Sequence, residues 1–202
     1  MSLPLRRTQE ERSAGTRARL LDATVNCLLD LGYHGTTTAA VQERAGLSRG
    51  ALMHHYASKT DLLVAAGRHL ADQRGANLRA RAAGLADDED RPAQAIDLLW
   101  DTMSGPLFTA TLELWAASRT DAELRRALLE SERGLRAHLD HVMAELFGAR
   151  ASSEPAFAGA MEMTLQFLRG AALTSILRES RGRQQAVIDG WKKLFSHMLE
   201  EP

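Results

Sequence analysis

Apolar residues recur every three to four positions along most of the chain, the spacing of a helix with one buried face. Within 16–31, for example, Leu21, Val25 and Leu28 repeat in this way, and Gly32 follows directly, as a glycine that ends a helix often does. Strict apolar–polar alternation is absent, and strong helix formers (Ala, Leu, Arg, Glu) dominate. The pattern predicts an all-α fold.

We expect about nine helices, several of them placed by proline, glycine or capping signals. Ser58-Lys59-Thr60-Asp61 resembles a capping box with Asp in place of Glu, and Thr120-Asp121-Ala122-Glu123 fits the standard form, with Thr120 as the cap. A loop is expected over 148–153. The expected helices are 16–31, 38–45, 48–56, 58 to about 83, 92–103, 106–117, 120–147, 154–179 and 183–199.

Three segments follow from this division. Residues 1–15 are expected to form a flexible basic arm, residues 16–63 a three-helix helix-turn-helix domain, and residues 64–202 a larger helical domain for ligand binding and dimerisation. No apolar run approaches the ~20 residues that a membrane span needs, and the first residues are polar, so neither a span nor a signal peptide is expected. A single cysteine, Cys27, excludes an intrachain disulfide and fits a reducing, cytoplasmic location.

The charge distribution adds modest support for DNA binding. The whole chain has a net charge of −1, but residues 1–60 carry eight basic and five acidic side chains, which leaves the remainder acidic. A small basic module on an acidic body suits a DNA-binding protein, although random scatter of surface charge would give a similar asymmetry. Charge alone therefore decides little.

Two short helices joined by a tight turn form the most informative segment, residues 37–52. Thr37 or Thr38 is expected to cap the first helix, Gly46 to supply the positive φ of the turn, and Ser48 to cap the second helix. Leu52 then faces inward. The outward side of such a second helix enters the major groove in helix-turn-helix proteins, although the same corner also occurs as plain architecture.

Residues 17–63 resemble the DNA-binding domain of the TetR family of bacterial regulators. The resemblance rests on three spaced landmarks: 32–38 (Gly-Tyr-His-Gly-Thr-Thr-Thr), 44–52 (Arg-Ala-Gly-Leu-Ser-Arg-Gly-Ala-Leu) and 54–63 (His-His-Tyr-Ala-Ser-Lys-Thr-Asp-Leu-Leu). It covers about a quarter of the chain. The resemblance implies a cytoplasmic homodimer that binds a double-stranded DNA operator of near-palindromic sequence, and a helical body with a ligand cavity.

By position, the resemblance implies a set of residues that contact DNA. The set includes Thr37 as the alternative cap of the first short helix. The set is Thr37, Thr38, Ser48, Arg49, Gly50, His54, Tyr56 and Lys59. The sequence departs from the family at Met53, where a phosphate-binding tyrosine is usual, and at Tyr56, where phenylalanine is usual. Because methionine cannot donate a hydrogen bond to phosphate, that contact is either lost or transferred to His54 or His55.

Aromatic residues and methionines in the second half are candidates for a ligand cavity or for a plain hydrophobic core. The candidate ligand residues are Trp100, Met103, Phe108, Leu112, Trp115, Thr164 and Phe167. Such a cavity would take a small apolar or amphipathic molecule. His138, His141 and Glu145 could form a polar pocket wall or simply an exposed helix face.

The last two helices carry a further apolar stripe. In the TetR family these helices of two subunits form a four-helix bundle, which makes the stripe the candidate dimer interface. Its residues are Phe157, Met161, Leu165, Leu168, Ala172, Trp191, Leu194, Phe195 and Met198. Gly170, with its alanine neighbours, would allow close packing there.

Catalytic signals are weak. No phosphate-binding loop, nucleophile motif or metal-ligand spacing occurs, and isolated carboxylates such as Glu113 and Glu162 would more often orient a ligand than act as acids. We therefore expect no enzyme, no cofactor and no metal. The expected function is a repressor that a ligand releases from DNA, with the fourth helix transmitting the change. The alternative is a helical small-molecule-binding or adaptor protein whose helix-turn-helix is vestigial.

Overall fold

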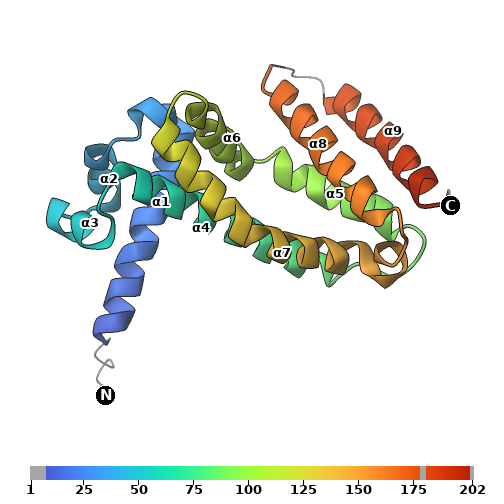
Figure 1. The fold of residues 1–202 in the computed structure, drawn as a ribbon, viewed down its shortest axis with the longest axis horizontal. Helices are drawn as coiled ribbons and strands as arrows, with labels where there is room; N and C mark the ends of the chain where they lie inside the picture. Colours follow the sequence, from blue (N-terminus) through green and yellow to red (C-terminus); the bar gives the residue numbers. More distant parts are fainter. Residues whose placement is uncertain (1–7, 178–180, 201–202) are drawn as a thin grey trace. The chain divides into compact units, whose positions relative to one another are not determined.

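The structure, a computed structural model, describes residues 8–177 and 181–200, apart from the side chains of 132–139 and 181. Throughout these residues the regular structure is helical and no strand occurs, which confirms the all-α prediction (Figure 1). The elements are α1 (Gln9–Gly35), α2 (Thr38–Ala45), α3 (Arg49–His55), α4 (Lys59–Ala82), α5 (Arg91–Met103), α6 (Pro106–Ser118), α7 (Ala122–Ser152), α8 (Phe157–Ser175) and α9 (Arg181–Glu200).

The chain divides into two compact units. The head unit comprises Met1–Leu70 and Glu113–Ser131, and the body unit comprises Ala71–Leu112 and Glu132–Pro202. The head therefore includes the end of α6 and the start of α7, which a boundary drawn at residue 63 leaves out. Close packing explains the addition: a Cβ placed on Gly67 of α4 would lie only 3.5 Å from a Leu114 methyl of α6.

Helix α1 begins earlier than its apolar pattern predicts. Thr8 and Glu11 form a capping box, with the Glu11 amide donating to the Thr8 hydroxyl and the Thr8 amide donating to the Glu11 carboxylate. Residues 9–15, expected to belong to a flexible arm, are consequently helical. The break at Gly32 is confirmed, because this residue has φ 66° and ψ −177° within the span of α1.

Helix α7 differs from its prediction at both ends. Asp121 caps it, accepting a 2.9 Å hydrogen bond from the amide of Leu124, so the expectation of Thr120 as the cap was wrong. At the other end Gly148 interrupts the helix with φ 81°, and a helical turn continues to Ser152 where a loop was expected. Arg91 holds this end by donating to the carbonyl oxygens of Leu146 and Glu145.

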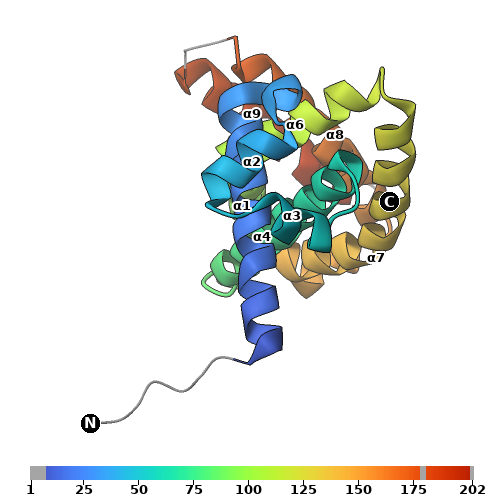
Figure 2. The ribbon, with the colours of Figure 1, turned by 90° about the vertical axis from the view of Figure 1, so that its left-hand side faces the viewer.

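Each unit has an apolar core of its own. In the head, α2 and α3 contact α1, and the core includes Leu20, Val41 and Leu52, all 0 % exposed (Figure 2). Cys27 lies in the same core, as expected for a small apolar side chain, and burial raises the pKa of its thiol. In the body, α5 contacts α8 and α9.

Candidate nucleic-acid interface

The turn between α2 and α3 has the geometry that the sequence predicts. Thr37 caps α2 by accepting a hydrogen bond from the Ala40 amide, and Ser48 caps α3 by accepting one from the Ala51 amide. Gly46 lies between the helices in the left-handed conformation, with φ 61° and ψ 42°. The hydroxyl groups of Thr37 and Ser48 therefore each cap a helix of the head.

A contact from α1 reinforces this turn. Arg19 donates from its guanidinium to the carbonyl oxygens of Ala45 and Gly46, which lie beyond the hydrogen-bonded part of α2. The end of α2 is thereby held against α1, because carbonyl groups at a helix C-terminus lack partners in the helix and favour a cation. This fixes the direction in which α3 leaves the turn.

Helix α3 has a buried side and a continuous exposed side. Leu52 is 0 % exposed, whereas Arg49, Gly50, Met53 and His54 are all exposed. A Cβ on Gly50 would meet nothing nearer than the Ser48 hydroxyl oxygen at 3.9 Å, so the protein itself leaves that surface open. The exposed side combines a guanidinium, an imidazole and a bare stretch of backbone, which are groups that can read base edges or bind phosphate.

Two members of the expected DNA-contacting set lie elsewhere in the head. Tyr56 is only 5 % exposed, and its hydroxyl accepts a 3.3 Å hydrogen bond from Nε of Arg17, so its ring faces the core. Thr38 is half-buried, whereas Thr37 and Ser48 remain exposed besides capping their helices. Of the set, Ser48, Arg49, Gly50 and His54 lie at the start of α3 or on its exposed side, and Tyr56 lies beneath that surface.

Lys59 is the other displaced member, because its amine is engaged within the head. It donates a 3.1 Å hydrogen bond to the carbonyl oxygen of Tyr33 and lies 4.4 Å from the centroid of the Tyr33 ring. Burial lowers the pKa of this amine, while the charge of Asp121 opposes the shift. The sequence predicted that Lys59 binds phosphate. In the structure its amine also contacts Tyr33 within the head.

Glu113 of α6 makes a second contact within the head, with the backbone of α1 at its break. Its Oε2 accepts a 3.0 Å hydrogen bond from the amide of Tyr33, and a Cβ on Gly32 would lie 3.1 Å from the same oxygen. Glycine at position 32 thus permits both the positive φ and the approach of the carboxylate. Glu113, considered in the sequence as an isolated acid, binds the backbone of α1.

The candidate ligand residues are divided between the units. Trp115 belongs to the head, and the other six belong to the body. Phe108 and Thr164 are buried, and Phe167 stacks on Trp191 at 4.5 Å between ring centroids. Trp191 also donates to the Thr164 hydroxyl. Trp100 is buried, and Met103 and Leu112 are half-buried. The Thr164–Phe167 pair therefore packs α8 against α9.

Much of the expected dimer stripe faces the interior of its own protomer. Met161, Leu168, Ala172 and Phe195 are at most 5 % exposed, and the Phe195 ring packs on another aromatic ring of the body. The stripe was chosen by apolar character, which also marks the inner face of a helix. Phe157, Leu165, Trp191 and Met198 are half-buried, and Leu194 is 56 % exposed.

Another apolar face of α8 and α9 is exposed. Its large members are Met163, Leu173, Val187 and Leu194, each 47–56 % exposed. Gly170 and Gly190 lie on the same helix sides, and a Cβ on either would have no neighbour within 4 Å. We call these six residues the outer face; α8 and α9 lie side by side in Figure 1. Sequence reasoning found only Leu194 of its large members.

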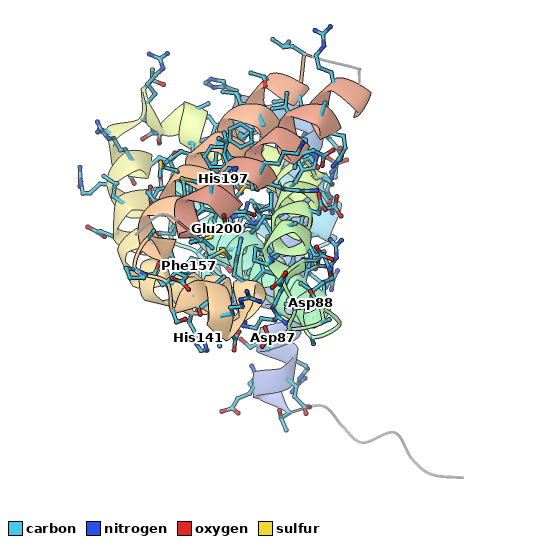
Figure 3. All side chains as sticks on the ribbon, turned by 90° about the vertical axis from the view of Figure 1, so that its right-hand side faces the viewer. Asp87, Asp88, His141, Phe157, His197 and Glu200 are labelled. Atoms are coloured by element: carbon cyan, nitrogen blue, oxygen red, sulfur yellow. The ribbon has the colours of Figure 1, made fainter. Side chains whose placement is uncertain are left out.

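A shallow hollow in the body unit lies beside the break at Gly148. Asp87, Arg91, His141 and Glu145 line it, and Figure 3 shows Asp87 and His141 at the same end of the body. His141 lies 3.2 Å from the Glu145 carboxylate, and its side chain is 69 % exposed, so these two residues form an exposed helix face that borders the hollow. The side chain of His138 lies outside the described residues.

Arg74 of α4 is a residue that sequence reasoning missed. Its guanidinium carbon lies 5.7 Å from the centroid of the buried Phe108 ring, inside the body unit. The signal was present in the sequence: Leu70 and Leu78, one turn to either side, are apolar and buried. A cation at that spacing interrupts an apolar stripe.

Comparison with known proteins agrees with this geometry. The sequence profile described as "Bacterial regulatory proteins, tetR family" matches residues 20–76. The HTH-type transcriptional regulator CymR of Pseudomonas putida is 29 % identical over 184 residues, covering 91 % of each chain. The HTH-type transcriptional regulator BetI of Burkholderia cenocepacia is 32 % identical over 158 residues, covering 77 % of this chain and 81 % of BetI.

A solved structure shares the fold. FadR from Bacillus subtilis, a transcriptional regulator solved in complex with stearoyl-CoA, superposes with a TM-score of 0.65 at 20 % identity, covering 88 % of this chain and 96 % of FadR. The matched relatives are transcriptional regulators and not enzymes, in agreement with the sequence-based expectation. In the described part of the chain no helix is long and apolar enough to cross a membrane, and no group of side chains there could hold a metal ion.

Proposed function

The chain belongs to the TetR family of bacterial DNA-binding transcriptional regulators, and from this premise we propose that it is a cytoplasmic, ligand-relieved repressor that binds a near-palindromic operator as a homodimer. The observation that carries the proposal is the exposed side of α3. There Arg49, Gly50 and His54 are exposed, on a helix whose start and angle are fixed by Ser48 and Gly46. Such a side fits into a major groove.

The experiment that tests DNA recognition compares two arginines of the head unit. Selection of bound sequences from random DNA gives the operator, and Arg49→Ala is then compared with Arg126→Ala, which removes the same charge from an exposed position of α7. Arg49→Ala is expected to lose roughly tenfold or more in affinity and to bind with a shallower salt dependence. Arg126→Ala is expected to bind like the parent protein.

Equal binding by both variants, or failure to select any sequence, would favour the alternative of a ligand-binding or adaptor protein with a vestigial helix-turn-helix. Lys59→Ala is a less clean test, because it also removes the contacts of Lys59 with Tyr33. Arg49 makes no such contact with another described residue and therefore isolates the DNA contact.

The outer face supports the homodimer. Exposed leucine, valine and methionine side chains on two adjacent helices, with Gly170 and Gly190 between them, suit close packing against a second copy of the same helices. Two-fold pairing would present two α3 helices to one side of the DNA, about one helical turn apart, and the operator would then be a near-palindrome. Palindromic sites among the selected sequences would support this step.

Relief by ligand requires a path from the body to the head, and α4 supplies one. This single helix runs from Lys59 beside the α3 region to Ala82 in the body unit. Ligand binding that favours one position of α4 would weaken operator binding, and operator DNA would weaken ligand binding by the same factor. Because Gly67 lies against Leu114, Gly67→Val is expected to uncouple the two events.

A further inference from the structure

A half-buried cation lies against the apolar core of the body unit. Arg74 shares one side of α4 with Leu70 and Leu78, which are 0 and 6 % exposed, and its guanidinium carbon is 5.7 Å from the Phe108 ring, which is 2 % exposed. A guanidinium can rest on an aromatic ring, but the ring neutralises none of its charge. The site therefore remains electrically positive.

A second cation lies close by. The charge of Arg169 on α8 acts on Arg74, and together with burial, the larger cause, it lowers the pKa of Arg74 to about 10. The ion pairs between described side chains join Arg79 to Glu145 and Arg81 to Asp101 on the same helix, but none includes Arg74. A half-buried guanidinium that forms no ion pair with a described side chain, as at Arg74, favours a bound anion.

We propose that the effector of this regulator is an organic anion whose acid group pairs with Arg74 while its apolar part packs against Phe108. The proposal deepens the ligand-relieved regulation proposed above and rests on it. A carboxylate can accept two parallel hydrogen bonds from one guanidinium, which fixes the orientation of the ligand as well as its charge. A cationic ligand would add to the repulsion between the arginines, and a neutral one would leave it in place.

The position of Arg74 also gives the acid group a mechanical role. Arg74 belongs to α4, the helix that begins at Lys59 in the head unit. An anion bound at Arg74 thus acts directly on the helix that carries the change, whereas an apolar contact with α8 or α9 alone would not. The acid group of the ligand would therefore contribute to release from DNA as well as to affinity.

The test uses the full-length protein, two carboxylate probes and two variants. The probes are 2-naphthoate and decanoate, each paired with its neutral primary amide, and binding is measured by calorimetry. Arg74→Met removes the charge and keeps an apolar side chain of similar length. Arg81→Met is the matched control, because Arg81 lies on the same helix but forms a surface ion pair with Asp101 at 2.7 Å.

The parent protein is expected to bind at least one carboxylate roughly tenfold or more tightly than its amide, because a charge-assisted hydrogen bond is lost in the amide. Arg74→Met is expected to bind both forms at the affinity of the amide, and Arg81→Met to keep the preference. Without any probe, Arg74→Met is expected to melt at a higher temperature than the parent, since it removes the repulsion with Arg169, whereas Arg81→Met is not.

The absence of a carboxylate preference in the parent protein, including no binding of any probe, would overturn the proposal whatever the melting temperatures. A lower melting temperature for Arg74→Met would overturn it as well, because it would show that Arg74 has a stabilising role in the ligand-free body. Operator binding is measured on the same samples. Loss of operator binding by the parent would instead contradict the proposed function, so the two failures are distinguishable.

Discussion

The hydroxyl of Tyr33 donates a 2.6 Å hydrogen bond to Oδ2 of Asp121, the residue that caps α7. The backbone of Tyr33 makes two further hydrogen bonds. Its amide donates to Glu113, and its carbonyl oxygen accepts from Lys59. One residue, placed directly after the break in α1, therefore ties this helix to α4, α6 and α7 within the head unit. The position of α1 depends on all three.

This hydrogen bond predicts a pH dependence of stability. Burial, and then the bond to Asp121, raises the pKa of Tyr33 from 10.0 to about 12. A raised pKa means that the stabilisation is complete below pH 10.0 and is lost as the pH rises through about 12. The pKa of Asp121 is lowered from 3.8, chiefly by the Leu124 amide and then by Tyr33, so its stabilisation is complete above pH 3.8 and is lost in stronger acid.

We expect Tyr33→Phe to lose less stability than the parent protein in the alkaline range, because only the parent must retain a proton on the tyrosine. Phenylalanine keeps the ring that faces Lys59. Denaturant unfolding followed by circular dichroism at neutral and alkaline pH measures the difference. Parallel alkaline profiles of the two proteins would show that the hydrogen bond does not stabilise the head.

Gly50 is a position at which an effect on stability can be measured separately from an effect on DNA binding. A Cβ at this position would lie 3.9 Å from its nearest neighbour, the Ser48 hydroxyl, so Gly50→Ala is compatible with the fold. The substitution is expected to raise the free energy of unfolding by about 0.5–1 kcal/mol, because alanine loses less backbone entropy in a helix. Operator affinity is expected to fall, because the proposed interface would place the added methyl group against DNA.

The measurements are chemical denaturation and a gel-shift titration with the selected operator. Unchanged operator affinity in Gly50→Ala would place the close approach of DNA elsewhere on the head. A loss of both stability and affinity would contradict the open space beside Gly50.

Met53 is 47 % exposed on the same helix and occupies the position where the resemblance implies a phosphate-binding tyrosine. Met53→Tyr would restore a hydroxyl donor to phosphate, and we expect about a three- to tenfold gain in operator affinity from one added hydrogen bond to a charged group. The gain should be similar for specific and unrelated DNA, because phosphate carries no sequence. Met53→Phe is the control and should bind like the parent; equal gains by both variants would attribute the effect to the ring.

The outer face gives a prediction about assembly. Leu173 and Leu194 are each 56 % exposed, so glutamate at either position disturbs no core of the protomer. Leu173→Glu and Leu194→Glu are expected to yield folded monomers, since charge at the centre of a helix–helix interface is left without a partner. Sedimentation velocity measures the mass. Leu129→Glu, at a 45 % exposed position of the head unit, should leave the proposed dimer intact.

Local signals in the sequence predicted the head well, because they act between neighbours. The Ser58–Asp61 capping box is present, with each backbone amide bound to the other side chain, and Gly46 has the expected positive φ. The outward side of α3 followed from the position of Leu52 alone. Element ends were less certain, as the cap of α7 shows: Thr120 and Asp121 are both good caps, and only the structure distinguishes them.

The body was harder to predict because apolar character does not say which side of a helix is covered. Met161 and Phe195 were assigned to an interface between subunits and instead fill the core of one. The arginine at position 74 was overlooked because a charged residue suggests a surface. Its partly buried position beside Phe108 and the charge of Arg169 nearby depend on residues that are distant in sequence and are brought near only by the fold.

The contact between Gly32 and Glu113 leads to a prediction that combines two substitutions. Gly32→Ala is expected to lower the free energy of unfolding by about 1–2 kcal/mol for the positive φ alone. The new Cβ would also lie 3.1 Å from Oε2 of Glu113 and push the carboxylate away from the Tyr33 amide. Glu113→Ala removes that hydrogen bond, at a cost of about 1–2 kcal/mol.

The double variant should therefore be more stable than the sum of the single losses predicts, by roughly 0.5–1 kcal/mol, because the lost hydrogen bond is counted in both single variants and Glu113→Ala also removes the crowding. Urea unfolding of the four proteins measures this coupling. Additive losses would show that the methyl group and the carboxylate do not interact, and the α6 contact would then be independent of the break in α1.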